Sequence, residues 1–214
     1  MNSIIRRPFK YSNNGAVYWL IGINVIIFAA MQLLGRNFWM FLAERMAMIP
    51  LAVRNGWIWT FVTYMFIHYD FRHILFNMLG LFIFGMHVER QMGSREFLLY
   101  YFVTGTLAGV FSFVAYYLTG NYMVALMGAS GAVFAVELAY AVFFPNSVIY
   151  IWGILPMRAP VMVLVFTALE LFFSISGRRS NVAHLTHLAG FAFGWIYFLI
   201  RFGMSPWKQL TGRN

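Results

Sequence analysis

The sequence of 214 residues contains no cysteine, and charged residues make up only 10% of it, whereas 62% of its residues are hydrophobic. The absence of cysteine excludes disulfide bonds, thiolate metal sites and a cysteine nucleophile. Covalent catalysis would therefore have to use Ser, Thr, Lys or a carboxylate. A soluble domain carries about 25% charged residues, so this composition indicates a membrane protein.

Acidic residues are the scarcest charged class, with 6 Asp and Glu against 15 Lys and Arg, which gives a net charge of +9. In a soluble protein this excess would suggest a nucleic-acid partner. Here the basic residues are scattered between apolar runs, as is typical of loops that meet anionic lipid headgroups. We therefore expect the lipid bilayer, and no nucleic acid, as a partner.

Long intervals without charge predict six membrane-spanning helices, because one span needs about 20 predominantly apolar residues. Breaks at 119–121, 145–146 and 177–179 divide the longer apolar stretches. The expected fold is an all-α membrane protein. Its helices are expected at about residues 16–34, 71–88, 97–118, 129–144, 158–175 and 184–201.

An even number of spans places both termini on one side of the membrane. Nine basic residues fall on that side and six on the other, which favours cytoplasmic termini. We expect residues 1–15 and 202–214 to form cytoplasmic segments around a helical domain of residues 16–201. The loop of roughly 36 residues after the first helix contains three tryptophans and is expected to rest in the headgroup region.

Polar residues inside a bilayer are costly and need a reason. His73 and Asn77 are four residues apart, so both side chains project from one face of the second helix. An imidazole and an amide aimed at one spot can donate hydrogen bonds to a developing negative oxygen. The alternative is that they hydrogen-bond a neighbouring helix.

Ser130 opens the short fourth helix between Gly128 and Gly131, which leave its hydroxyl unhindered. The first turn of a helix also presents free backbone N–H groups that suit an oxyanion. The alternative is close helix packing, since Gly131, Ala135 and Ala139 form a stripe of small residues. Both interpretations are compatible.

His187 has glycines three and seven residues later, which places it on a close-packing face of the sixth helix. If that face meets the fourth helix, a Ser–His pair results, in which the imidazole takes the hydroxyl proton. A structural hydrogen bond or a metal site is the alternative. No two of His68, His73, His184 and His187 have the His-x-x-x-His spacing, so we expect no metal and no cofactor.

Two acids, Glu137 and Glu170, lie in apolar helices. Glu137 is two turns beyond Ser130, about 10 Å deeper by helical rise, and so is too far away to orient a base at the serine. A packing role or an internal water site is the favoured interpretation for Glu137. No specific function is predicted for either acid.

As an ordered set, these motifs resemble the rhomboid intramembrane serine proteases. Residues 128–131 resemble the nucleophile motif of that family, His73 and Asn77 its oxyanion motif, and residues 187–194 its base motif. The likeness covers roughly residues 17–200. Flanking matches are Asn24, Phe28, Trp59, Thr63, Phe66, His68, Glu89, Gly93 and Phe97.

The resemblance implies a catalytic dyad of Ser130 and His187 without a third acidic member. His73, Asn77 and the Ser130 backbone amide would stabilise the oxyanion, and Phe134 would stack on the His187 ring. The short fourth helix would start inside the bilayer below a water-filled cavity. The fifth helix and residues 177–181 would form a substrate gate and a cap.

The implied function is that of a serine endopeptidase cutting transmembrane protein substrates in or near their membrane-spanning segments, and its expected location is a bacterial inner membrane. The alternative is an inactive rhomboid-like protein that binds transmembrane helices. The sequence departs from the family pattern at Thr60, at Glu137 and at His184, an extra histidine one turn before His187. Only His187 has both glycines, so His187 is the expected base.

Overall fold

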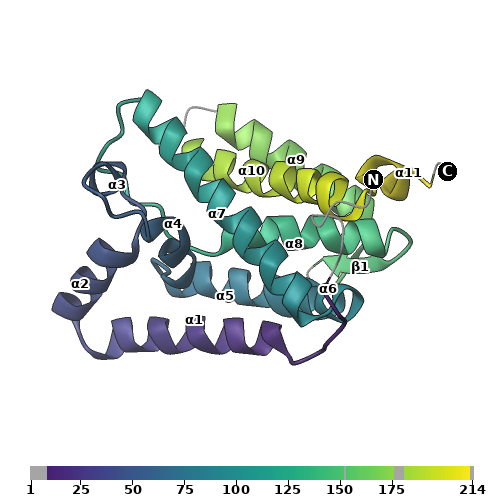
Figure 1. Ribbon diagram of the computed structural model, residues 1–214, viewed down its shortest axis with the longest axis horizontal. Helices are drawn as coiled ribbons and strands as arrows, with labels where there is room; N and C mark the ends of the chain where they lie inside the picture. Colours follow the sequence, from purple (N-terminus) through teal and green to yellow (C-terminus); the bar gives the residue numbers. More distant parts are fainter. Residues whose placement is uncertain (1–8, 152, 176–180, 213–214) are drawn as a thin grey trace.

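Helices dominate the computed structural model, which describes residues 9–151, 153–175 and 181–212 (Figure 1). Within these residues, four helical segments are long and apolar enough to cross a membrane, and two apolar helices are shorter. The long segments are Ala16–Leu33, Phe71–Met92, Ser94–Leu118 and His184–Phe202, and the shorter ones are Ser130–Phe143 and Ala159–Ile175. Each of the six expected ranges is helical within the described residues, and four of these helices have the length and composition of an ordinary span.

The long segments correspond to named elements, some of which run into one another. The Phe71–Met92 segment joins α5, a π-helical turn η3 and α6 without a break, and α10 continues into a second π-helical turn, η4. The bounds are α1 Ala16–Leu33, α5 Phe71–Gly80, η3 Leu81–Gly85, α6 Met86–Met92, α7 Ser94–Leu118, α8 Ser130–Phe143, α9 Ala159–Ile175, α10 Asn181–Tyr197 and η4 Phe198–Phe202.

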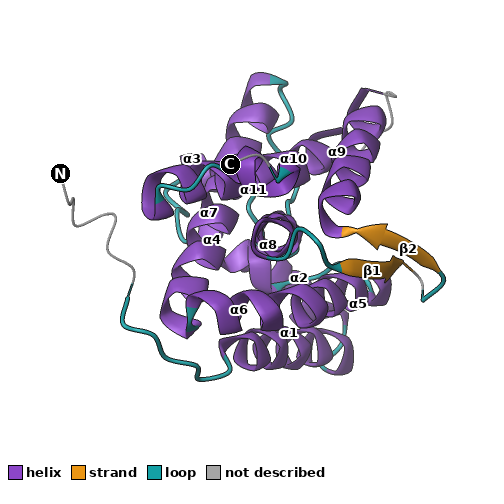
Figure 2. Ribbon diagram, turned by 90° about the vertical axis from the view of Figure 1, so that its right-hand side faces the viewer, coloured by secondary structure: helices purple, strands orange, loops and turns teal. Residues whose placement is uncertain are grey.

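The α8 helix lies at the centre of the structure, and Figure 2 looks along it with the other helices around it. Its 14 residues span about 21 Å by helical rise, less than the roughly 30 Å of a hydrocarbon core. Small side chains let α10 approach closely. A Cβ atom on Gly190 would lie 2.1 Å from the Gly131 carbonyl oxygen, and one on Gly194 would lie 3.3 Å from the Ala135 Cβ.

The segment between α1 and α5, expected as a loop, contains short helices: α2 Arg36–Met46, α3 Pro50–Arg54, α4 Thr60–Thr63 and the 3-10 turn η2 Tyr64–Phe66. Backbone groups of this segment form hydrogen bonds with the irregular stretch of chain between α7 and α8. Met48 and Leu126 exchange two backbone hydrogen bonds of 3.1 and 2.9 Å, and the Gly128 N–H donates to the Tyr64 carbonyl at 2.9 Å. Unpaired backbone groups are costly away from water, so these bonds make the irregular path tolerable.

The described residues are mostly helical, as expected of an all-α membrane protein, and they also include a β-hairpin. Strands β1 Val148–Ile151 and β2 Leu155–Arg158 pair antiparallel, with Val148 opposite Arg158. The helix signal ends at Pro145, as expected, and the apolar run that follows is rich in β-branched residues, which favour a strand. A last short helix, α11 Pro206–Thr211, lies in the region expected as a tail.

Two buried acids fix the ends of the helices. The Glu89 carboxylate accepts the backbone N–H groups of Ala16 and Val17 at 2.6 and 3.0 Å, and so caps α1. Glu96 on α7 pairs with Arg201 on η4 at 2.7 Å.

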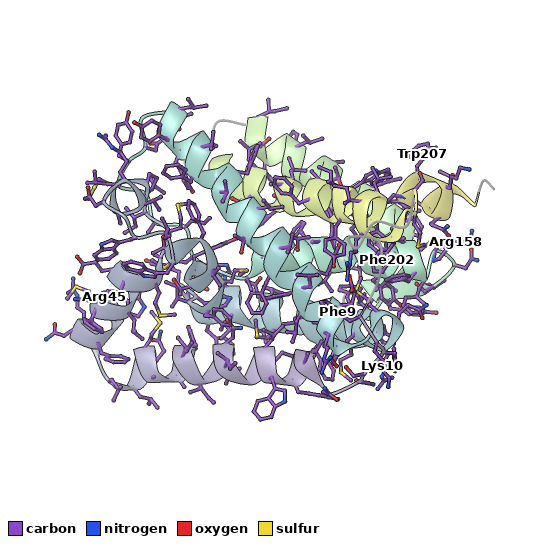
Figure 3. The ribbon with its side chains drawn as sticks, viewed as in Figure 1. Phe9, Lys10, Arg45, Arg158, Phe202 and Trp207 are labelled. Carbon is purple, nitrogen blue, oxygen red and sulfur yellow. The ribbon has the colours of Figure 1, made fainter. Side chains whose placement is uncertain are left out.

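Figure 3 places Lys10 and Arg158 at one end of the structure and Arg45 at the other, in line with the expected division of basic loops.

Candidate active site

Ser130 and His187, on different helices, meet in the interior. The Ser130 Oγ lies 2.8 Å from the His187 Nε2, which is hydrogen-bond distance. Ser130 is the first residue of α8, where the backbone N–H groups of the first turn have no helical partner. The pair therefore has the arrangement in which an imidazole can take a hydroxyl proton beside oxyanion donors.

The close contact between Gly190 on α10 and Gly131 on α8 explains how Ser130 and His187 can approach each other. Gly190, one turn after His187, lies directly against the backbone of Gly131, the neighbour of Ser130. No side chain larger than hydrogen fits between these two positions. The close packing of small residues and the Ser–His contact thus occur together where α8 meets α10, so the two interpretations of the sequence are compatible.

Phe134 lies one turn after Ser130 and stacks on the imidazole of His187. The two ring centroids are 4.4 Å apart and the planes differ by 11°. A parallel stacked ring restricts rotation of the imidazole about its side-chain bonds. This is the geometry that the resemblance implied for Phe134.

His73 and Asn77 lie on the opposite side of the serine, on α5. The His73 ring packs so close to Gly128 that a Cβ there would lie 2.4 Å from its Nε2, and Gly128 has a φ of 108°. The Asn77 Nδ2 donates to the His73 carbonyl at 2.8 Å. An amide nitrogen carries two hydrogens, so this bond uses one of them.

His68 is fully buried, next to His73 on α5 and to Ala129 just before α8. Its Nε2 accepts the N–H of Ala129 at 3.4 Å, and its ring centroid is 5.0 Å from that of His73. Burial, with a smaller contribution from His73, lowers the pKa of His68 to about 3. His68 is therefore neutral at physiological pH and supports the turn before Ser130.

A cavity of about 590 Å³ joins these side chains. Ser130, His187, His73, Asn77 and Phe134 all line it. Residues of the β-hairpin, missed by sequence reasoning, also line it: Ile149, Tyr150 and Ile151. Of the expected gate and cap, α9 contributes Met162 and Phe166 to the lining, while residues 177–180 lie outside the described residues.

Glu170 on α9, for which the sequence predicted no role, contacts two histidines of α10. Its Oε2 lies 2.6 Å from the His184 Nδ1, and its Oε1 lies 3.1 Å from the His187 Nδ1. One signal in the sequence pointed there: His184 and His187 are three residues apart, so they share a helix face that one buried acid on a neighbouring helix can reach.

Glu170, His184 and His187 also form a candidate metal-binding group. One donor atom from each lies within 4.8 Å of the others, and two imidazoles with a carboxylate are a donor set that zinc uses. The carboxylate already pairs with both rings, so the ion pairs account for the cluster without a metal.

Glu137 lines the same cavity, and its Oε1 faces Gly80. Its Oε2 has no hydrogen-bond partner within the described part of the chain. An internal water site, expected from the sequence, fits such a group.

Comparison with known proteins agrees with this architecture. Residues 55–204 match the model of the rhomboid domain. The chain is 32% identical to the rhomboid protease GlpG of Haemophilus influenzae over 83% of this chain and 88% of that protein. It is 31% identical to the putative rhomboid protease YdcA of Bacillus subtilis, over 68% of each chain.

A plant relative is similar at a comparable level. The chloroplastic rhomboid-like protein 16 of Arabidopsis thaliana is 29% identical over 83% of this chain, which spans 59% of the length of that protein. The matched range covers most of the chain, and Ser130, His187, His73 and Asn77 lie within it. The chain is a multi-pass membrane protein that belongs to the rhomboid family.

Proposed function

We propose that this protein is an intramembrane serine endopeptidase that cleaves peptide bonds in or near the transmembrane segments of other membrane proteins. The observation that carries the proposal is the 2.8 Å contact of the Ser130 Oγ with the His187 Nε2, inside a cavity that polar groups line. Relatives named as proteases support the same activity.

In the proposed reaction, His187 Nε2 removes the hydroxyl proton while Ser130 Oγ attacks the carbonyl carbon of the scissile bond. The Ser130 backbone N–H, His73 and Asn77 stabilise the negative oxygen of the tetrahedral intermediate. His187 then returns its proton to the leaving amine. Water adds to the acyl-enzyme by the same sequence, and Phe134 holds the imidazole in place throughout.

The membrane topology belongs to the same proposal. All six apolar helices span the bilayer, both termini face the cytoplasm, and residues 16–201 form the protease domain between segments 1–15 and 202–214. The short α8 begins inside the membrane, so the cavity brings water to Ser130. Lipid excludes the water that hydrolysis needs, and a helical substrate hides its carbonyls in hydrogen bonds. Substrate helices weakened by Gly or Pro are therefore expected to be preferred.

The test is a cleavage assay with purified protein in detergent or liposomes, on a panel of model membrane substrates. Ser130→Ala and His187→Ala should abolish cleavage and labelling by a fluorophosphonate probe. Ser174→Ala and His87→Ala, which change the same residue types away from the cavity, should behave as wild type. Equal cleavage by wild type and Ser130→Ala would overturn the proposal. A folded wild-type protein that neither cleaves nor labels would favour an inactive binder of transmembrane helices.

A further inference from the structure

The carboxylate of Glu170 lies between two imidazoles of α10, and one of them is the expected base. Its two oxygens are divided between them: Oε2 is 2.6 Å from the His184 Nδ1 and Oε1 is 3.1 Å from the His187 Nδ1. The Glu170 side chain is only 14% exposed, and those of His184 and His187 are 23% and 21% exposed. The three groups thus form a chain of polar contacts at the edge of the cavity.

The position of Glu170 follows from the face of α9 that meets the site. Phe166, one turn earlier on the same helix face, lies 6.4 Å from the ring of Phe134 and lines the cavity. An acid in an apolar helix is costly unless it is paired. Pairing with His184 and His187 offsets that cost, and it also directs the carboxylate to the side of His187 that faces away from Ser130.

The two nitrogens of His187 have different tasks. To accept the serine proton, Nε2 must carry the lone pair, so the ring proton must reside on Nδ1. Within the described residues, the Nδ1 of His187 has no hydrogen-bond partner, and the Glu170 Oε1 is the group at ion-pair distance. A carboxylate beside Nδ1 favours this tautomer, and it stabilises the imidazolium that forms when Nε2 takes the proton.

We propose that Glu170 is a positioning residue for His187 and that it acts together with His184, which orients the carboxylate from the other side. The proposal rests on the function proposed above and adds an acidic partner to a pair for which the sequence resemblance implied none. Glu170 acts through His187 and does not touch the substrate.

The competing explanation is that Glu170 only clamps α9 to α10. Conservative variants of the 214-residue chain in detergent separate the two roles. Glu170→Gln keeps the volume of the side chain but removes its charge, while Glu170→Asp keeps the charge but shortens the side chain. A positioning role predicts the higher turnover number for Glu170→Asp, and a clamp that depends on packing predicts the higher turnover number for Glu170→Gln.

The experiment measures kcat and KM on a model membrane substrate and the rate of fluorophosphonate labelling. All values are normalised to the end-point fraction of labelled protein, which counts only folded sites. Glu170→Gln should lower kcat on the order of 10²-fold and leave KM within about twofold. The fall should be smaller than the roughly 10⁴-fold known for the aligned acid of a serine-protease triad, because the contact with His187 is not an aligned hydrogen bond. Glu170→Asp should recover part of the loss.

Glu44→Gln, which removes an exposed carboxylate of α2, should match wild type. A wild-type kcat in Glu170→Gln, or a higher kcat in Glu170→Gln than in Glu170→Asp, would overturn the positioning role while leaving the Ser130–His187 pair intact. If wild type itself shows no cleavage or labelling, the proposed function fails instead. The two failures are therefore distinguishable.

Discussion

From the contact between Gly190 and the backbone of Gly131, we predict that Gly190→Ala increases the distance between Ser130 and His187. The Cβ atom that Gly190→Ala adds would lie 2.1 Å from the Gly131 carbonyl oxygen, whereas Cβ atoms in proteins keep at least 3.0 Å from such neighbours. The obstacle is backbone, so no side chain can rotate away. The two helices must separate by about 1 Å to accept Gly190→Ala.

The separation acts directly on the pair. Gly131 follows Ser130, and Gly190 is one turn from His187, so the 2.8 Å contact should lengthen to nearly 4 Å, beyond hydrogen-bond reach. A displacement of this size is expected to lower turnover about 10²-fold. Overpacking should also destabilise the fold by about 1–3 kcal/mol.

The assay compares labelling rate, substrate turnover and the thermal unfolding midpoint of Gly190→Ala with those of wild type. Gly22→Ala is the matched control, because a Cβ at Gly22 on α1 would meet nothing within 4 Å. Gly22→Ala should keep wild-type activity and stability. Wild-type labelling and turnover in Gly190→Ala would refute the reasoning that this glycine contact sets the distance of the pair.

Three further predictions concern the groups around the pair. Asn77→Ala should lower turnover about 10²-fold with little change in the unfolding midpoint, since one oxyanion donor is lost; an unchanged turnover number would remove Asn77 from the site. Phe134→Leu should lower turnover about 2- to 10-fold by removing the stack on His187, and full activity would show that the stack is dispensable. His68 has a pKa of about 3 in the folded protein and an ordinary value of 6.5. Because the unfolded chain binds the proton more readily, the free energy of unfolding should fall by up to about 1.4 kcal/mol per pH unit as the pH drops from about 6 to 4. The His68→Gln variant should show a shallower dependence in thermal unfolding, and equal slopes would contradict this assignment.

The main helices could be predicted from the sequence because uncharged apolar runs and their breaks are local signals. The expected limits of the third and fourth helices, 97–118 and 129–144, differ from Ser94–Leu118 and Ser130–Phe143 by three residues or fewer. The hairpin could not be predicted in the same way. The run after Pro145 is rich in β-branched residues, but a short apolar run does not by its periodicity distinguish a strand from a helix.

The proposed serine and histidine could be found because each lies in a run of small residues with a fixed spacing. Glu170 does not lie in a run of small residues with a fixed spacing. Its partner is on another helix, and which face of α9 meets α10 depends on tertiary packing. The spacing of His184 and His187 is compatible with a buried acid on a neighbouring helix, but only the packed structure identifies that acid as Glu170.

The irregular backbone before α8 has a consequence for how the protein is made. Its hydrogen-bond partners, Met48, Tyr64 and His68, precede it in the chain by about 60 to 80 residues. During synthesis from the N-terminus, these partners leave the ribosome before the segment that needs them. The partners of this irregular backbone are therefore already available when the serine-bearing segment is made, whereas His187 follows later. A circular permutant that reversed this order would make the irregular segment before the residues that pair with its backbone.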